Sequence, residues 1–184
     1  MDDYVLKLLD GFMPHFSDLT IVCNGKLNDA GREKLLRYTS KLIMRENRGF
    51  DVWAYKTALD SYGWHKLEQF DEIVLFNATI MGPVYPFSEM FDAMNKRDLD
   101  FWGITKFHRV EHDPFGRSPY PYLPEHIQSH FHAYRKSLHT SQAFREYWDN
   151  IPPINDYYDS VGLHESLFTK RFADKGFKWD VYVN

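Results

Sequence analysis

The chain has 184 residues, of which 43% are hydrophobic and 26% charged, and its formal net charge is −4. This composition suits one soluble globular domain over residues 1–184, and the acidic balance without a long basic run argues against a nucleic-acid-binding protein. No apolar run approaches the ~20 residues of a membrane helix, and the single Cys23 excludes an intramolecular disulfide. We therefore expect a cytoplasmic protein with at most peripheral contact to the inner face of the membrane.

Helices and strands are expected to alternate along the first hundred residues. Apolar residues at helical spacing predict that the chain opens with a helix, and short apolar runs bounded by turn residues predict strands. The expected strands are 19–24, 41–47, 72–76 and 100–105, and the expected helices are 2–12, 31–38, 50–63 and about 87–94. This alternation favours an α/β fold with a mainly parallel sheet and helices on both faces.

Residues 106–124 interrupt the alternation. They contain four prolines and one glycine, which predicts a long loop, and their aromatic content favours a lid over a ligand. The following segment alternates as a strand does, which would place His126, Gln128, His130 and His132 on one face. If this segment were a helix, His126 and His130 would lie one turn apart on one face, as in some zinc sites. The flanking prolines favour the strand, and no third zinc ligand is identified.

Two helices and a strand are expected in the last quarter of the chain. Residues 141–151 form an amphipathic pattern that ends at Pro152-Pro153. A second helix is expected from about Ser160 to Lys175, closed by Gly176 and followed by a terminal strand.

The end of the strand 72–76 is a candidate binding site. Asn77-Ala78-Thr79 follow it directly, and ligands of open α/β sheets bind beyond the carboxyl ends of the strands. The triplet also has the spacing of an N-glycosylation signal, but that signal acts only in secreted chains. We therefore interpret the triplet as part of a ligand site.

Five segments in a fixed order carry a family resemblance: 45–56, 71–91, 100–105, 126–131 and 164–179. The set resembles the rhamnan synthesis protein F family, bacterial glycosyltransferases that build rhamnose-containing cell-surface polysaccharides. The resemblance covers nearly the whole chain. It implies a GT-A-like (Rossmann-like) fold and inverting transfer of a sugar, expected to be L-rhamnose from a dTDP-linked nucleotide-sugar donor, to a polysaccharide or lipid-linked acceptor.

The segment 164–179 is similar to a pattern of inverting GT-A enzymes, in which an acidic residue precedes a basic residue and a Gly-aromatic pair. Here these are Glu165, Arg171 and Gly176-Phe177. The resemblance implies that Glu165 is the general base, which accepts the acceptor's proton as its oxygen attacks the anomeric carbon. A place near the start of a helix would favour the charged carboxylate. The alternative is a solvent-exposed helix residue, and Asp156 and Asp159 are the fallback bases.

The segment 45–51 lies where such enzymes bind the nucleotide. The predicted strand ends at Arg45-Glu46-Asn47, Gly49 allows a tight turn, and a helix begins near Asp51. Helix N-termini bind phosphate, and Arg45 or Arg48 would add charge-assisted hydrogen bonds. Asp51 equally suits a plain helix N-cap. The resemblance thus implies a donor site; its residues are Arg45, Asn47, Gly49, Asp51, Asn77 and Thr79.

The chain departs from the family pattern at Ala78, where members more typically read Asn-Asp-Ser. Carboxylates there hold a divalent cation, Mg²⁺ or Mn²⁺, that bridges the donor's diphosphate. Alanine cannot ligate a metal, so the pattern leaves open a metal-dependent enzyme and a catalytically impaired relative that binds sugar or a protein partner. Asn77 and Thr79 could still hydrogen-bond a sugar or phosphate, and His126 or His164 could supply a metal ligand. The expected acceptor or sugar contacts are Trp102, His126, Gln128, Ser129 and His164.

A second departure concerns the first strand. GT-A enzymes begin with a strand before their first helix, whereas this chain opens directly on the predicted helix 2–12. We therefore expect a sheet that lacks this strand, in a shortened chain or one whose gene start is placed too late. Such a sheet exposes an edge or recruits a protein partner or a second copy to cover it.

Overall fold

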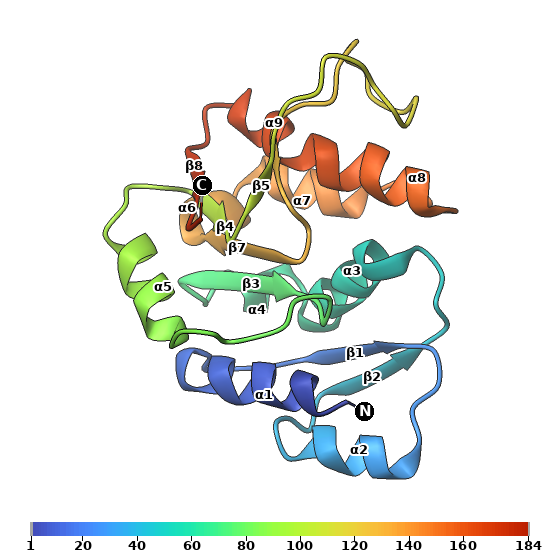
Figure 1. The fold of residues 1–184 in the computed structure, drawn as a ribbon, viewed down its shortest axis with the longest axis vertical. Helices are drawn as coiled ribbons and strands as arrows, with labels where there is room; N and C mark the ends of the chain where they lie inside the picture. The colour runs from blue at the N-terminus through green and yellow to red at the C-terminus, as the bar shows by residue number, and fades with distance from the viewer. Residues whose placement is uncertain (1, 184) are drawn as a thin grey trace.

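The computed structural model describes residues 2–183, which form a mixed α/β fold (Figure 1). In chain order the elements are α1 (Asp3–Phe12), η1 (Met13–His15), β1 (Ile21–Asn24), α2 (Asp29–Leu36), β2 (Leu42–Arg45), α3 (Phe50–Tyr62), α4 (Trp64–Leu67), β3 (Glu72–Phe76), α5 (Phe87–Asn95), β4 (Phe101–Gly103), β5 (Lys106–Phe107), β6 (His126–Ile127), β7 (Phe131–Arg135), α6 (Lys136–His139), α7 (Gln142–Asp149), α8 (Tyr157–Asp159), η2 (Ser160–Glu165), α9 (Ser166–Ala173) and β8 (Trp179–Val181). The expected strands and helices of the first hundred residues are confirmed with small shifts at their ends.

The main sheet has four strands in the order β3-β7-β4-β8. Strand β7 runs antiparallel to both β3 and β4, while β4 and β8 are parallel. The prediction of a mainly parallel sheet is therefore wrong for β7. The reason is the connection between β4 and β7, which contains no helix; parallel neighbours need a crossover, whereas an antiparallel return does not.

Strands β1 and β2 form a separate parallel pair. Within residues 2–183, neither strand pairs with β3, although both point in the same direction as β3 in Figure 1. Helices α1 and α3 flank the interval between β1 and β3 from opposite sides.

Residues 106–127 form an antiparallel hairpin arm, not the structureless loop that the prolines predicted. Strands β5 and β6 pair at its base, and Val110 and Leu123 exchange two backbone hydrogen bonds further out. Near the tip, Arg117 Nε donates to Asp159 Oδ1 at 2.8 Å. The arm is thus fastened to the start of the last long helix.

That last helix begins earlier than predicted. Asp156 caps it by accepting a hydrogen bond from the Asp159 backbone N at 2.8 Å, and the helical path continues through α8, the π-helical η2 and α9. Glu165 therefore lies mid-helix, and the expectation that it sits near a positive helix end is wrong. A π turn inserts an extra residue into the helical path and is frequent at functional sites.

Two aromatic clusters form the core. The larger one lies among α3, α7, α9 and the main sheet, and includes Phe144, Tyr147 and Trp148 of α7 and Ile151 just after it. The smaller one joins α1 and α5 to the other side of the sheet through Phe12, Met94, Trp102 and Phe131. Aromatic residues make up 17% of the chain, and most of them belong to these two clusters or pack against them.

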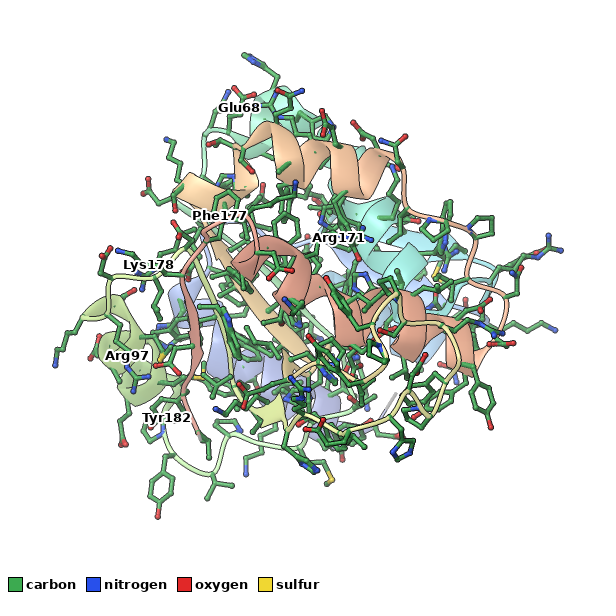
Figure 2. All side chains as sticks on the ribbon, turned by 90° about the horizontal axis from the view of Figure 1, so that it is seen from above. Glu68, Arg97, Arg171, Phe177, Lys178 and Tyr182 are labelled. Carbon is green, nitrogen blue, oxygen red and sulfur yellow. The ribbon has the colours of Figure 1, made fainter. Side chains whose placement is uncertain are left out.

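The C-terminal strand β8 is tied to the chain near α5. Arg97 donates to Asp180 Oδ2 at 2.8 Å and to the Val181 carbonyl at 3.0 Å, and Lys178 pairs with Asp98 at 2.5 Å. Arg97, Lys178 and Tyr182 lie along one side of the molecule in Figure 2.

Across residues 2–183, no helix has the length and apolarity that crossing a bilayer would demand.

Helix α7 offers a local test of the fold. Ser141 is its N-cap, and its Oγ accepts a hydrogen bond from the Phe144 backbone N at 3.2 Å. We expect Ser141→Ala to lower the free energy of unfolding by about 1 kcal/mol, because one helix N–H loses its acceptor. Urea denaturation measures this, with Ser61→Ala as control, whose hydroxyl bonds only its own helix. Equal stability of the two variants would contradict the capping role.

Candidate functional site

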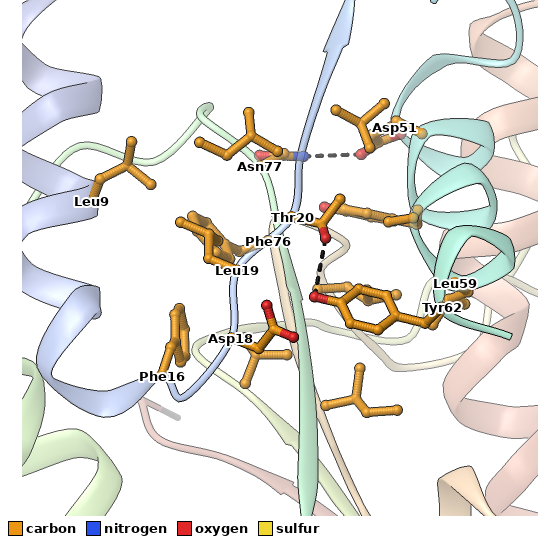
Figure 3. Close-up of a pocket in the computed structure, with 18 of the residues that line it drawn as sticks. Leu9, Phe16, Asp18, Leu19, Thr20, Asp51, Leu59, Tyr62, Phe76 and Asn77 are labelled. Atoms are coloured by element: carbon orange, nitrogen blue, oxygen red, sulfur yellow. Dashed lines mark hydrogen bonds between the residues drawn. The ribbon is translucent and has the colours of Figure 1, made fainter. Parts of the chain in front are cut away.

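Four polar side chains from distant parts of the chain meet at the carboxyl end of β3. We call Asp51, Asn77, Ser129 and Glu165 the carboxylate cluster. Ser129 Oγ donates to a Glu165 carboxylate oxygen and lies 3.4 Å from Asp51 Oδ2. Asn77 Nδ2 donates to the same Asp51 oxygen at 2.9 Å, as Figure 3 shows. The proposed base and three of the other predicted binding residues are thus brought together.

Local backbone geometry places each member of the cluster. Asn77 N donates to the His130 carbonyl at 3.1 Å, which extends the β3–β7 ladder by one residue. Gly49 and Phe50 have positive φ angles of 76° and 54°, and this left-handed turn aims the first turn of α3, with Asp51, at the cluster. A Cβ at Gly49 would lie 2.2 Å from Trp53 Cδ1, so the predicted tight turn requires glycine.

Glu165 is held between a hydroxyl and an imidazole. His126 Nδ1 lies 2.7 Å from the Pro124 carbonyl, which can only accept, so Nδ1 carries a proton. The other ring nitrogen, His126 Nε2, lies 3.7 Å from Glu165 Oε1. The histidine is 2% exposed and the Glu165 side chain 21%, which leaves the carboxylate reachable from outside.

The two carboxyl groups of the cluster have pKa values displaced in opposite directions. Burial raises the pKa of Glu165, but its contacts with His126 and Ser129 outweigh burial and lower the pKa to about 2. Burial raises the pKa of Asp51 above its ordinary value; the hydrogen bond from Asn77 lowers it in part, and the charge of Glu165 raises it further. Such divergent pairs are typical of acid–base sites, and the pKa of Glu165 leaves its carboxylate ionised at neutral pH.

Tyr55 supports the cluster and was missed by the sequence reasoning. Its hydroxyl donates to the Ser129 carbonyl at 2.9 Å, which ties the turn between β6 and β7 to α3. Tyr55 follows Asp51 by four residues, so both lie on one face of α3. The four-residue spacing from Asp51 was the sequence signal that could have identified Tyr55.

The predicted nucleotide segment forms a clamp at the start of α3. Arg45 donates to Asn24 Oδ1 and to the Arg48 carbonyl, both at 2.6 Å, and Asn24 Nδ2 donates to the Phe50 carbonyl at 3.0 Å. Burial lowers the pKa of Arg45. Asn24 was not predicted, and Asn47 is exposed at the edge of this clamp.

The residues after Asn77 form a turn. Asn77 Oδ1 accepts from Thr79 N at 3.0 Å and from Thr79 Oγ1 at 2.5 Å, so this oxygen already has two donors. Ala78 and Thr79 are exposed. Among residues 2–183, no group of three or more His, Cys, Asp or Glu side chains has an arrangement that could hold a metal ion.

Comparison with known proteins decides the family. Residues 19–184 match the sequence model of rhamnan synthesis protein F. The chain belongs to the rhamnan synthesis protein F family.

The other similarities are more distant. The chain is 26% identical over 159 residues to "Uncharacterized protein y4gN" of Sinorhizobium fredii (strain NBRC 101917 / NGR234); the match covers 86% of this chain and 39% of that relative. The chain thus spans well under half of its relative's length. A solved CMP:2-keto-3-deoxy-manno-octonic acid synthetase in complex with CTP aligns with 98% of this chain and 78% of its own, at 12% identity and a TM-score of 0.46.

Some residues expected from the rhamnan synthesis protein F resemblance lie away from the cluster. Trp102 is buried, and its Nε1 donates to Glu72 Oε2 at 3.0 Å. His164 is also buried, with Nδ1 2.5 Å from the Tyr147 hydroxyl, and burial lowers its pKa to about 3. Both belong to the aromatic core of this family member.

The histidines of the 126–132 segment do not share a face as predicted. Strand β6 ends at Ile127 and β7 begins at Phe131, so the intervening turn breaks the alternation. His132 is buried, with Nδ1 bonded to the Tyr134 hydroxyl at 3.0 Å. Gln128, half-buried, accepts a hydrogen bond from Thr105 at 2.8 Å.

The remaining candidates of the last helix are also outside the cluster. Asp159 pairs with Arg117, and Asp156 caps the helix, so both fallback bases have structural partners. Arg171 is exposed on α9, with its guanidinium 5.0 Å from the centroid of the Tyr147 ring (Figure 2).

Proposed function

We propose that this member of the rhamnan synthesis protein F family is a glycosyltransferase that uses a nucleotide-sugar donor. The observation that supports it most is the carboxylate cluster, in which an ionised, reachable Glu165 faces the start of α3 across Ser129. The family's description, rhamnan synthesis, supports L-rhamnose from a dTDP-linked donor as the sugar transferred.

In the proposed reaction, an acceptor hydroxyl lies at Glu165 and its oxygen attacks the anomeric carbon of the donor. Glu165 takes the hydroxyl proton, the glycosidic bond forms, and the nucleoside diphosphate leaves from the opposite side with inversion.

The donor's diphosphate is proposed to lie at the N-terminus of α3. The first backbone N–H groups of α3 have no partner within the helix, and those of Asp51 and Val52 lie against the Asp51 carboxylate, which an anion would have to displace. Arg45 lies beside this helix start in the clamp with Asn24. Asn77 is hydrogen-bonded to Asp51 and Thr79 beside this proposed diphosphate site, and its amide is suited to orient a sugar.

The second candidate is a family member that binds a sugar or a partner without catalysing transfer. The observation that favours it is Ala78 at the position where the family pattern carries a carboxylate. A binding assay and a turnover assay together separate the two candidates, because only the enzyme consumes the donor.

We expect dTDP or dTDP-rhamnose at about 100 times its Kd to stabilise the protein by ~2.7 kcal/mol. For a chain of this size that corresponds to a rise in Tm of about 5 to 10 °C. Thermal-shift titrations with dTDP, dTDP-rhamnose and UDP-sugars, each with and without Mn²⁺, measure it.

Arg45→Gln should weaken this rise, and the exposed Arg37 supplies the matched control, Arg37→Gln. If no nucleotide raises the Tm, the donor-binding proposal is wrong. If a nucleotide-sugar binds but is never consumed, the non-catalytic candidate holds.

A further inference from the structure

A groove of about 310 Å³ lies between α9 and the outer part of the hairpin arm, and we call it the arm groove. Its volume falls in the range of small-molecule sites, roughly 300 to 1,000 Å³. Six residues line it: Pro119 and Tyr120 of the arm, and Leu167, Arg171, Asp174 and Lys175 of α9 and the turn after it. None of them belongs to the carboxylate cluster, so the arm groove is a separate place on the molecule.

Two cations of the arm groove lie one helical turn apart. Arg171 follows Leu167 by four residues and Lys175 follows Arg171 by four, a spacing that puts side chains on the same face of a helix. The helical path continues past the end of α9, because the Asp174 backbone N donates to the Lys170 carbonyl at 2.9 Å. Arg171 and Lys175 can therefore contact one ligand together.

The arm groove has a positive charge that its own residues do not neutralise. Among residues 2–183, neither Arg171 nor Lys175 forms an ion pair, and both side chains are exposed. Asp174 is paired with Lys170 at 2.5 Å and accepts a hydrogen bond from the Tyr120 hydroxyl at 3.2 Å. Three cations thus stand against one carboxylate, which gives a net charge of +2. The negative C-terminal end of α9 offsets only about 0.5 of this charge.

An aromatic ring orients the guanidinium of Arg171, which is labelled in Figure 2. The guanidinium lies over the ring of Tyr147, 5.0 Å from its centroid, and this cation–π contact leaves its N–H groups available to a ligand. A guanidinium presents its donors as a fork that matches the oxygens of phosphate, and a lysine ammonium adds a compact charge. A phosphomonoester carries a charge of about −1.5 to −2 at pH 7, which matches the arm groove better than a singly charged carboxylate does.

The apolar part of the lining indicates that the phosphate is carried on a larger molecule. Pro119 and the buried Leu167 add apolar surface to the arm groove. Inorganic phosphate would contact the cations alone, whereas the sugar ring or glycerol chain of a phosphomonoester would also cover these apolar atoms.

We propose that the arm groove binds a phosphomonoester, of a soluble sugar phosphate or of a lipid headgroup, through Arg171 and Lys175. The body of the ligand lies against Pro119 and Leu167. This site gives a role to Arg171, the basic residue of the segment 164–179, which lies outside the carboxylate cluster. The site goes beyond the proposed function, because the proposed contacts of the donor come from α3 and Arg45.

Two probes test the two sources of the phosphate. Isothermal titration with glucose 1-phosphate tests the soluble source, and glucose itself should not bind. Co-sedimentation with phosphatidylcholine vesicles that contain or lack phosphatidic acid tests the headgroup source. We expect Arg171→Gln and Lys175→Gln each to weaken binding of the effective probe by about tenfold, because each removes one hydrogen bond between charged groups.

Lys96→Gln is the matched control, since Lys96 is an exposed lysine at the C-terminal end of α5, and it should bind as the wild type does. Arg45→Gln should also leave the affinity for glucose 1-phosphate unchanged, which separates this site from the donor site. Lys175→Gln keeps the test valid if loss of the contact with Tyr147 unfolds Arg171→Gln. Failure of both probes to bind, unchanged affinity in Lys175→Gln, or weakening by Arg45→Gln instead would overturn the proposal.

Discussion

Glu165→Gln is expected to lower kcat for sugar transfer by about 10²- to 10⁴-fold, the usual range for a lost general base. Glutamine keeps the shape of the side chain and its hydrogen bond with Ser129, but its amide cannot take the acceptor's proton. Nucleotide binding should change little, because the proposed diphosphate contacts come from the start of α3 and Arg45. Initial rates with dTDP-rhamnose and thermal shifts with dTDP measure the two effects separately.

The matched control is Glu33→Gln, which removes the charge of an exposed glutamate on α2. This variant should retain the normal rate. A normal rate for Glu165→Gln would show that another group accepts the proton, whereas loss of dTDP binding in that variant would show that the cluster shapes the donor site.

The second large effect concerns acid stability. The pKa of Glu165 is lowered from its ordinary 4.5 to about 2, so the folded state binds this proton less readily than the unfolded state. The resulting stabilisation is fully present above pH 4.5 and is lost as the pH falls toward 2. Its size is at most about 3 kcal/mol at pH 7.

Urea denaturation of the wild type and Glu165→Gln, repeated between pH 7 and pH 3, measures this. The wild type should be more stable by up to about 3 kcal/mol at pH 7, and the difference should shrink as the pH falls below 4.5. Asp51 makes this difference smaller. The charge of Glu165 helps to raise the pKa of Asp51, which destabilises the folded state, and the Glu165→Gln variant lacks that charge. The measured difference in the free energy of unfolding is therefore below the maximum. A difference that stays constant over this range would contradict the lowered pKa.

Local patterns predicted most elements of the fold. The apolar run 72–76 coincides with β3, and the helical spacing after Gly49 coincides with α3. These predictions hold because a run of apolar residues or a left-handed glycine constrains its own stretch of backbone, whatever lies around it. The start of the last helix was predicted too late: its cap is a local hydrogen bond from the Asp159 backbone N to Asp156, and the hairpin arm packs beside it through the pair Arg117–Asp159.

The sequence by itself indicated the family and most of the elements in their order, and it named Asp51, Asn77, Ser129 and Glu165 within a longer set of candidate site residues. Tertiary structure alone decided which candidates meet. It placed Asp51, Asn77, Ser129 and Glu165 together and left Trp102 and His164 in the core, because burial depends on which elements pack together. It also reversed β7 and left a cavity between β1 and β3, because strand pairing joins segments far apart in the chain.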